Sequence, residues 1–344
     1  MKILVTGNMG YIGSVLVPYL ASRGGYELYG FDAGYFEECL TGPRPENFLV
    51  RQYRGDIQNF PDELLNGMDA VIHLAALSND AMGVRFDQLT EAVNYQASVK
   101  LAQMARAHGV PKFIFASSCS LYGAGGDLAK TELDSLNPLT AYARSKSAVE
   151  AELKNLASPD FKIMALRFST ACGASPRLRL DLVLNDFVAT ALSEKIIRVM
   201  SDGSPIRPLI HVKDISRSLL WALNYQAQED YLVINIGSDH WNYQIKDLAE
   251  ICAKLIPKIK IEINPKAMPD KRSYRVNFAK FRELAPDYQP QMTLEKTVES
   301  LVWMCGKLDL SDRQSYIRLA MLESALAKKA PLGTLVVQSG NLMG

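Results

Sequence analysis

The stretch that decides the fold is Met1-Lys2-Ile3-Leu4-Val5-Thr6-Gly7-Asn8-Met9-Gly10-Tyr11-Ile12-Gly13. Its uncharged run Ile3–Val5 predicts a central strand that is buried on both faces of a parallel sheet. Three glycines follow at the spacing G-x-x-G-x-x-G, and the residues after Gly13 predict an amphipathic helix. A strand, a glycine turn and a helix in this order are typical of a dinucleotide-binding unit.

Each glycine of this turn has a physical task. Gly7 allows a sharp turn, Gly10 allows backbone to approach a pyrophosphate, and Gly13 allows the helix to pack against the strand. The helix N-terminus then offers free N–H groups and the positive end of its dipole to the phosphates.

The second predicted strand, Tyr26–Asp32, ends in an acid 19 residues after Gly13. A carboxylate at that position accepts hydrogen bonds from the adenosine ribose hydroxyls and repels a 2′-phosphate. Because neither Ala33 nor Gly34 supplies an arginine to neutralise such a phosphate, the sequence predicts NAD rather than NADP. A loop acid without a ligand is the alternative interpretation of Asp32.

Composition and charge exclude several other classes. The 344 residues are 48% hydrophobic and 22% charged, as in ordinary globular proteins, and the formal net charge is +1. This balance predicts no binding to nucleic acid or to an anionic membrane surface. Because no apolar stretch approaches 18 residues and no signal pattern is present, we expect a soluble, cytoplasmic protein. Five cysteines without a C-x-x-C pair and four scattered histidines predict neither a disulfide framework nor a metal site.

Strand and helix patterns alternate along the first part of the chain. Strands are predicted at 3–5, 26–32, 47–53, 68–76, 112–118 and 162–168, and helices after Gly13, over about 87–108 and over about 138–156. This alternation predicts an α/β protein with a doubly wound parallel (Rossmann) sheet and ligands at the carboxyl ends of its strands.

The pattern loosens after Phe168, which predicts a smaller interleaved α/β lobe that closes over the substrate. We therefore expect an NAD-binding Rossmann domain over residues 1–168, to which the chain returns near 205–235. The substrate-binding lobe comprises 169–204 and 236–310, and a C-terminal extension covers 311–344. A helix packed on the body with a loose tail and an oligomerisation arm are both consistent with that extension.

Two groups point to catalysis. Tyr142-Ala143-Arg144-Ser145-Lys146 is a Tyr-x-x-x-Lys motif, and its two ends share one helix face. A lysine ammonium there can hold the nicotinamide ribose and lower the pKa of the phenol, so that Tyr142 works as an acid and base near neutral pH. Ser118 ends the preceding strand, where its hydroxyl can contact the reacting sugar oxygen or simply cap backbone groups.

These motifs resemble the extended short-chain dehydrogenases/reductases of the nucleotide-sugar epimerase/dehydratase family. The matching residues span about residues 1–300. They are Thr6-Gly7-Asn8-Met9-Gly10-Tyr11-Ile12-Gly13, Asp32, Asp56-Ile57, His73-Leu74-Ala75-Ala76, Asn94, Ser117-Ser118, Tyr122-Gly123, Tyr142-x-x-x-Lys146, Leu166-Arg167 and Arg207-x-x-Ile210-His211-Val212-x-Asp214.

The resemblance implies tightly bound NAD, a nucleoside-diphosphate sugar as substrate and a catalytic set of Ser118, Tyr142 and Lys146. It also implies a homodimer that pairs through the helices at about 87–108 and 142–156. The cofactor-binding residues it implies are Gly7, Met9, Gly10, Tyr11, Ile12, Gly13, Asp32, Asp56, Ile57, Leu74, Ala75, Ala76, Asn94, Tyr142 and Lys146.

The substrate contacts are carried over in the same way. Asn185 matches the family's diphosphate-binding asparagine, and Arg207 and Arg272 match its two phosphate-clamping arginines, whose fork of donors suits phosphate. Arg177 and Arg179 are further candidates outside the general family pattern, and a bare surface arginine is the alternative for each of the four. Ser118 and Thr170 complete the predicted substrate set.

The chain departs from its relatives at three places. The family's dehydratases carry an acidic pair after the active-site hydroxyl, but Cys119 and Ser120 stand here, which disfavours 4,6-dehydration. Thr170 replaces the usual substrate asparagine of the galactose epimerases. The loop that begins at Leu77 is also unlike the common epimerase loop, so a standard UDP-glucose substrate is in doubt.

We therefore predict C4 epimerisation of a nucleotide sugar through a transient 4-keto intermediate. The alternatives are a nucleotide-sugar 4-dehydrogenase or a 4-ketosugar reductase with net redox change. A non-catalytic, NAD-sensing regulator is a further alternative, although such proteins typically lose the Tyr or the Lys that this chain retains.

Overall fold

A central sheet organises the computed structural model, which describes residues 1–124, 126, 128–264, 267, 272–327 and 336–339. The order of the strands is β10-β6-β5-β4-β1-β2-β3-β13. Their bounds are β1 Lys2–Thr6, β2 Glu27–Asp32, β3 Arg51–Arg54, β4 Ala70–His73, β5 Lys112–Ser118, β6 Lys162–Phe168, β10 Tyr231–Ile236 and β13 Val336–Ser339. All of these strands pair in parallel except β13, which runs antiparallel to β3. The predicted doubly wound α/β fold is confirmed.

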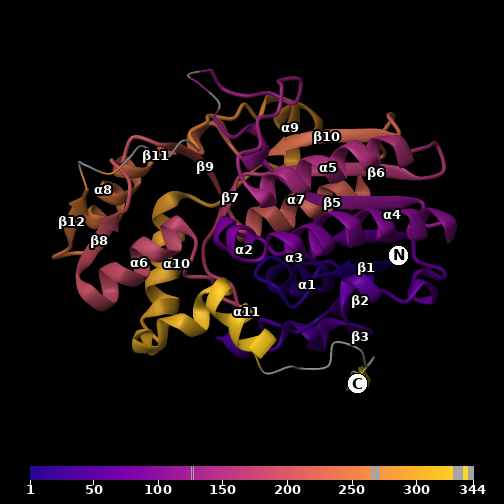
Figure 1. Ribbon diagram of the computed structural model, residues 1–344, viewed down its shortest axis with the longest axis horizontal. Coiled ribbons are helices and arrows are strands. Elements are labelled where there is room, and N and C mark those ends of the chain that lie inside the picture. The colour runs from indigo at the N-terminus through magenta and orange to yellow at the C-terminus, as the bar shows by residue number, and fades with distance from the viewer. Residues whose placement is uncertain (125, 127, 265–266, 268–271, 328–335, 340–344) are drawn as a thin grey trace.

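Helices cover both faces of this sheet (Figure 1). One face carries α1 (Gly13–Ala21), α7 (Val212–Asn224) and α9 (Ala279–Leu284), and the other carries α4 (Ala97–Ala107) and α5 (Ala141–Leu156). The side chains of β1 alternate accordingly, since Ile3 and Val5 pack in the α1–α7 core while Leu4 packs in the α4–α5 core. The short apolar run of β1 therefore lies between two apolar layers, one on each face of the sheet.

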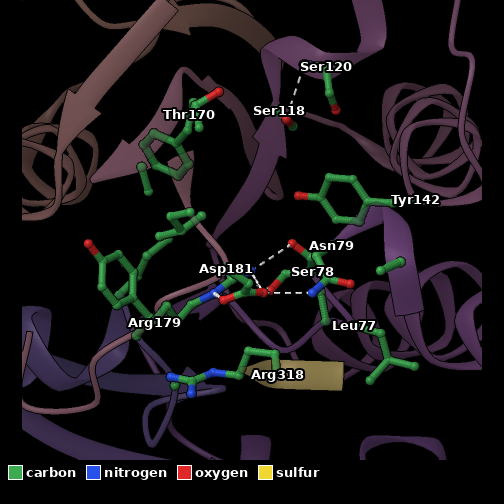
Figure 2. Close-up of a pocket in the computed structure, with 18 of the residues that line it drawn as sticks. Leu77, Ser78, Asn79, Ser118, Ser120, Tyr142, Thr170, Arg179, Asp181 and Arg318 are labelled. Atoms are coloured by element: carbon green, nitrogen blue, oxygen red, sulfur yellow. Dashed lines mark hydrogen bonds and ion pairs between the residues drawn. The ribbon is translucent and has the colours of Figure 1, made fainter. Parts of the chain in front are cut away.

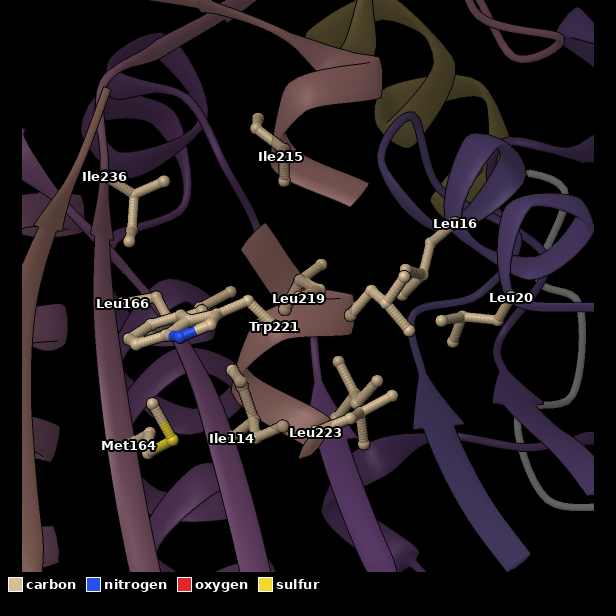
Figure 3. Packing of buried hydrophobic residues seen from close by; sticks show 14 of the residues in the cluster. Leu16, Leu20, Ile114, Met164, Leu166, Ile215, Leu219, Trp221, Leu223 and Ile236 are labelled. Atoms are coloured by element: carbon tan, nitrogen blue, oxygen red, sulfur yellow. The ribbon is translucent and has the colours of Figure 1, made fainter. Parts of the chain in front are cut away.

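The α1–α7 core is close-packed (Figure 3). Leu219 and Trp221 of α7 and Leu16 of α1 are at most 4% exposed, and the indole Nε1 of Trp221 donates to the carbonyl of Leu284. These contacts fix α1, and with it the glycine turn that precedes α1, against the carboxyl ends of the strands.

The smaller lobe lies at one end of the sheet domain (left in Figure 1). Its two small sheets have the orders β11-β9-β7 and β12-β8. The strands are β7 Thr170–Cys172, β8 Ile196–Val199, β9 Ile206–His211, β11 Asn242–Gln244 and β12 Lys260–Ile263, and the helices are α6 Val183–Glu194, α8 Ile245–Leu255 and α10 Leu294–Cys305. Of the predicted return near 205–235, α7 and β10 join the main sheet domain, whereas β9 pairs within the lobe.

Some elements differ from the sequence prediction. The strand expected over 47–53 starts at Arg51, because Pro45 opens a 3₁₀ turn that runs to Phe48. The helix expected over 87–108 consists of α3 (Asp87–Glu91), a π-helical turn (Ala92–Gln96) and α4. The sequence analysis did not anticipate α2 (Asp80–Arg85), α9 or α10.

The C-terminal extension adds α11 (Arg318–Ala327), which contacts α2. Leu322 of α11 is fully buried against Leu77 and Met82, so this helix packs on the body of the protein. The beginning of the apolar run at Leu335 lies outside the described residues. No helix in the described part of the chain is long and apolar enough to cross a bilayer.

Candidate active site

A cavity of about 900 Å³ opens at the carboxyl ends of β1 and β4, where the strand order changes direction. Such a switch point is where open α/β sheets bind their ligands. The glycine turn and the strand ends line one side, which we call the sheet side. Residues of the smaller lobe and of the C-terminal extension line the other, which we call the lobe side.

The structure brings most of the predicted site residues to this cavity. Those that line it are Gly7, Gly10, Tyr11, Ile12, Gly13, Asp32, Asp56, Ile57, Leu74, Ala75, Ala76, Ser118, Tyr142, Lys146, Thr170, Arg179, Arg207 and Arg272. Met9, Asn94, Arg177 and Asn185 do not line it.

The glycine turn has the tight geometry that its sequence requires. Gly7 has a φ of +73°, and a Cβ atom there would lie 2.5 Å from the backbone nitrogen of Ala75 on the neighbouring strand end. A Cβ atom on Gly13 would lie 2.5 Å from the Cα atom of Asn8. Only glycine fits at either position, so the turn can lie close to Ala75 and Asn8 at the edge of the cavity.

Asp32 is held in place for a ribose. Its Oδ1 accepts from the N–H of Gly34 at 2.8 Å, and its Oδ2 accepts from the N–H of Met9 at 2.9 Å. Burial raises the pKa of Asp32, and these two backbone hydrogen bonds oppose that rise. Met9 therefore contributes through its backbone, since its side chain is 1% exposed and points into the protein.

The residues present fit NAD. Asp32 and Asp56 both line the adenosine end, and Arg54 beside Gly34 is already paired with Glu37 at 2.5 Å. The carboxylates of Asp32 and Asp56 repel a 2′-phosphate, and Arg54 is engaged by Glu37, which together favour NAD over NADP.

Tyr142 and Lys146 face the cavity from α5, whose N-terminus is capped by Thr140. The Lys146 Nζ donates to the carbonyl of Ala116 at 2.8 Å and lies 5.9 Å from the centroid of the Tyr142 ring. Burial lowers the pKa of Lys146 to about 7, and the carboxylate of Glu150 opposes that shift.

Ser118 caps backbone and also lines the cavity. Its Oγ accepts from the N–H of Ser120 at 3.1 Å, which caps the turn after β5, and its side chain lines the cavity. Because the hydroxyl acts as acceptor in that bond, its hydrogen remains available for another acceptor. Figure 2 shows the hydroxyl of Tyr142 directed toward the space between Ser118 and Thr170.

Behind the active-site strands, a buried histidine braces the sheet. The Ser98 Oγ donates to the carbonyl of Asn94 at 2.7 Å, so it accepts from His73 Nε2–H at 2.8 Å. The Nδ1 of His73 then accepts from the Thr6 hydroxyl at 2.6 Å. This assignment makes the imidazole neutral, and burial lowers its pKa to about 3.

Arg177 lies elsewhere than the sequence analysis predicted for a substrate contact. Its guanidinium is fully buried behind the glycine turn, where Nη1 donates to the Ser14 Oγ at 3.0 Å and pairs with Glu46 at 2.6 Å. Arg179, two residues later, does line the cavity, and it forms a bidentate ion pair with Asp181. The two arginines therefore have different roles, which their spacing does not reveal.

Asn185 and Asn94 shape the walls rather than line the cavity. The Oδ1 of Asn185 accepts from the N–H of Gly173 at 2.9 Å, and its Nδ2 donates to the carbonyl of Arg179 at 2.9 Å. Asn94 holds both backbone groups of Leu77 in the same manner. Both amides thus fix loops that carry cavity residues.

Several cavity residues were missed by sequence reasoning. Asp181 accepts from Asn79 at 2.6 Å and from Arg179, and these three side chains lie together below Tyr142 in Figure 2. Tyr274, Arg313 and Arg318 also line the lobe side. The only available signal was the stretch from Arg177 to Asp181, in which charged residues alternate with leucines, and this alternation does not show which charged side chains face the cavity. No group of three or more potential metal ligands occurs among the described residues.

The comparison with protein families decides how this arrangement is classified. The model of the family described as "NAD dependent epimerase/dehydratase family" matches residues 3–237. The chain belongs to this family. It is an NAD-dependent enzyme.

Individual relatives agree with this placement. UDP-glucose 4-epimerase from Corynebacterium glutamicum is 26% identical over 88% of this chain and 95% of its own. A crystal structure of UDP-glucuronic acid 4-epimerase from Bacillus cereus, in complex with NAD and UDP-4-deoxy-4-fluoro-glucuronic acid, is 26% identical. It covers 90% of this chain and 100% of its own, with a TM-score of 0.78. An NAD-dependent NDP-hexosamine 5,6-dehydratase of tunicamycin biosynthesis shares the fold, with a TM-score of 0.80, 22% identity and coverage of 90% and 99%.

Proposed function

We propose that this enzyme inverts the configuration at C4 of a hexose or hexuronic acid carried on uridine diphosphate, through a transient 4-keto sugar. The observation that carries the proposal is the convergence of Tyr142, Lys146 and Ser118 on the cavity that holds the dinucleotide-binding turn. The two UDP-sugar 4-epimerases described above are each 26% identical to nearly the whole chain, which supports the choice of reaction.

Tyr142 is the proposed acid and base. Its phenolate accepts the proton of the C4 hydroxyl as the carbonyl forms, and it returns the proton when the carbonyl is reduced. Lys146, 5.9 Å from the ring centroid, stabilises the phenolate and orients the ribose next to it. Ser118 donates to the same sugar oxygen. Bound NAD supplies reversible hydride transfer at C4.

The lobe side is proposed to hold the diphosphate while the sugar turns over. Arg207 extends from β9 into the cavity, with its guanidinium 5.7 Å from the Tyr274 ring centroid, and Arg272 lines the same region. Guanidinium groups bind diphosphate oxygens through paired N–H donors. Anchoring the nucleotide in this way leaves the keto sugar free to present its other face before reduction.

Dehydration is disfavoured by the residues that follow Ser118. Cys119 is fully buried, its thiol donates to the carbonyl of Arg167, and burial raises its pKa. Ser120 is an alcohol that lines the cavity. Neither residue supplies the carboxylic acid that would protonate a departing hydroxyl.

A product assay tests the proposal. The purified enzyme is incubated with UDP-glucose, UDP-N-acetylglucosamine and UDP-glucuronic acid without added cofactor, and proton NMR follows the C4 epimers. The expected result is an equilibrium mixture of epimers from at least one substrate, with no deuterium at C4 in heavy water, because hydride returns within the active site.

Other outcomes identify the alternatives. NADH that accumulates in proportion to product would replace epimerisation with net oxidation of the nucleotide sugar. If no nucleotide sugar reacts, and none raises the melting temperature beyond the effect of NAD, the NAD-sensing regulator becomes the better account.

We also propose that the enzyme is a cytoplasmic homodimer that pairs through α4 and α5. All five cysteines are buried and free, which suits a reducing compartment. Light scattering coupled to size-exclusion chromatography measures the mass directly. A monomeric mass at micromolar concentration would contradict the dimer.

A further inference from the structure

An arginine from the C-terminal extension lines the cavity. Arg318 begins α11, beyond the region that the family model matches, and its side chain is 2% exposed. Figure 2 shows Arg318 entering from α11, with the Arg179–Asp181 pair between it and Tyr142. The guanidinium stacks over the Phe36 ring at 4.7 Å from the centroid.

The hydrogen-bond partners of Arg318 in the described part of the chain are neutral groups. Its Nη2 donates to the carbonyl of Arg177 at 2.9 Å, and its Nη1 has only the sulfur atoms of Cys39 and Met321 as acceptors, at 3.3 and 3.2 Å. Sulfur is a weak acceptor. No carboxylate in the described part of the chain forms an ion pair with Arg318, and burial lowers its pKa. Because burying a cation without an anionic partner is costly, an anionic ligand would stabilise Arg318 at this position.

The position of Arg318 in the cavity indicates which anion it binds. On one side it contacts Phe36, four residues after the ribose-binding Asp32. On the other side, the Arg179–Asp181 pair lies between Arg318 and Tyr142 (Figure 2). Arg318 also donates to the carbonyl of Arg177, whose guanidinium contacts Ser14, directly after the glycine turn. It thus lies between the adenosine end and the reacting end of the cavity, at the middle of an extended dinucleotide.

We propose that Arg318 binds the pyrophosphate of NAD and that α11 thereby retains the cofactor. The glycine turn offers N–H groups to the phosphates from the sheet side, and Arg318 offers a guanidinium fork from the opposite wall. The proposal rests on NAD binding alone, so it holds whichever sugar reaction the enzyme catalyses.

The packing of α11 on the protein explains how this helix could retain the cofactor. Leu322 packs against Leu77 and Met82, and Leu319 and Leu326 extend this contact. Leu77 also lines the cavity, and Asn94 holds its backbone. Because α11 rests on a cavity wall, the pyrophosphate contact and the apolar contact must both break before the helix swings away.

The test compares Arg318→Gln with two controls. Arg85→Gln removes an exposed arginine whose ion pair with Glu323 joins α2 to α11, and Leu322→Ala loosens α11 without a change of charge. Calorimetric titrations measure the dissociation constants of NAD, ADP and adenosine. Arg318→Gln should weaken NAD and ADP by roughly 10- to 100-fold and change adenosine less than 3-fold, as expected for a lost charged hydrogen bond.

The controls separate electrostatics from structure. Arg85→Gln should leave all three constants unchanged. Leu322→Ala keeps the guanidinium but loosens its support, so it should weaken NAD and ADP less than Arg318→Gln does. Raising the salt concentration should weaken NAD binding in the parent enzyme more than in Arg318→Gln. If Arg318→Gln does not fold, Arg318→Lys replaces it, and NAD binding several-fold weaker than in the parent with unchanged adenosine binding is then expected.

Three results would overturn the proposal. They are unchanged NAD affinity in folded Arg318→Gln, equal losses for ADP and adenosine, and weakened binding of UDP with unchanged binding of ADP. The last result would assign Arg318 to the substrate diphosphate. Each can be obtained without turnover, so a wrong sugar substrate does not affect the conclusion.

Discussion

The sheet side and the lobe side of the cavity bind through different kinds of groups. On the sheet side, the cavity is shaped mainly by backbone geometry, at the turn that contains Gly7 and at the strand end where a backbone N–H holds Asp32. On the lobe side, long arginines such as Arg207 and Arg318 reach into the cavity from β9 and α11. Backbone geometry tolerates few residue types, whereas a long side chain can be supplied from many positions. Four predictions test this contrast, in order of decreasing effect.

The largest effect is expected at Tyr142, the proposed acid and base on the sheet side. Tyr142→Phe should lower kcat by about 10²- to 10⁴-fold, because the phenyl ring cannot move a proton. NAD content should stay unchanged. Tyr26→Phe is the control, since its hydroxyl pairs with Asn224, outside the cavity lining. Near-normal turnover by Tyr142→Phe would remove Tyr142 from the mechanism.

The next effect concerns the turn itself. In Gly7→Ala, the new Cβ atom would lie 2.5 Å from the Ala75 nitrogen at a φ of +73°, so both strain and a clash arise. We expect roughly 3 kcal/mol of lost stability or more, together with loss of bound NAD. Thermal unfolding and the ratio of NAD to protein measure both.

Gly67→Ala is the matched control for that substitution. Gly67 has a φ of +70°, but no atom lies within 4 Å of its Cβ position. It should lose only about 1–2 kcal/mol, the cost of the left-handed conformation alone. Equal losses in the two variants would mean that the turn is less tightly packed than its geometry indicates.

On the lobe side, Arg207→Lys should raise KM by roughly 10-fold and change kcat less. Lysine keeps the charge but loses the paired donors that grip a diphosphate. Steady-state kinetics and the affinity for UDP provide the measurement, with the exposed Arg23→Lys as control. A change confined to kcat would indicate that Arg207 acts on the transition state instead of anchoring the substrate.

The smallest effect is expected for the pH dependence of folding stability that arises from His73, which lies behind the sheet side. The folded pKa of His73 is about 3, below the unfolded value of 6.5, so the unfolded state binds more protons between these pH values. His73 therefore makes stability fall as pH drops from 6.5 toward 3, by about 1.4 kcal/mol per pH unit.

His73→Gln removes this titration, and its amide can replace both hydrogen bonds to Thr6 and Ser98. Denaturant unfolding should give a shallower acid limb for the variant and parallel curves at pH 7–8. If the unfolding free energies of the parent and the variant fall equally steeply between pH 6.5 and 4, His73 does not contribute to the acid destabilisation. His211, whose pKa burial lowers to about 4, would then be the source of that destabilisation.

The sheet side was largely predictable from sequence because its signals are local. The strand at Ile3–Val5, the glycine spacing and the acid at position 32 are each set by neighbours in the chain, and the structure brings them together as expected. The spacing of Tyr142 and Lys146 on α5 is likewise a property of one helix.

The lobe side was less predictable because long side chains depend on tertiary partners. Nothing local distinguishes Arg177, which is buried by Ser14 and Glu46, from Arg179, which faces the cavity beside Asp181. The role of α11 was also missed, since its apolar stripe signals packing but not the wall on which it packs.

The contact of α11 with residues near the N-terminus has a consequence for the synthesis of the enzyme. Cys39 and Arg318, which meet beside the cavity, are 279 residues apart in the chain. During synthesis the glycine turn emerges early, yet the opposite wall is translated only after the whole smaller lobe. If Arg318 retains NAD as proposed, the cofactor meets a cleft that lacks this wall until α11 docks.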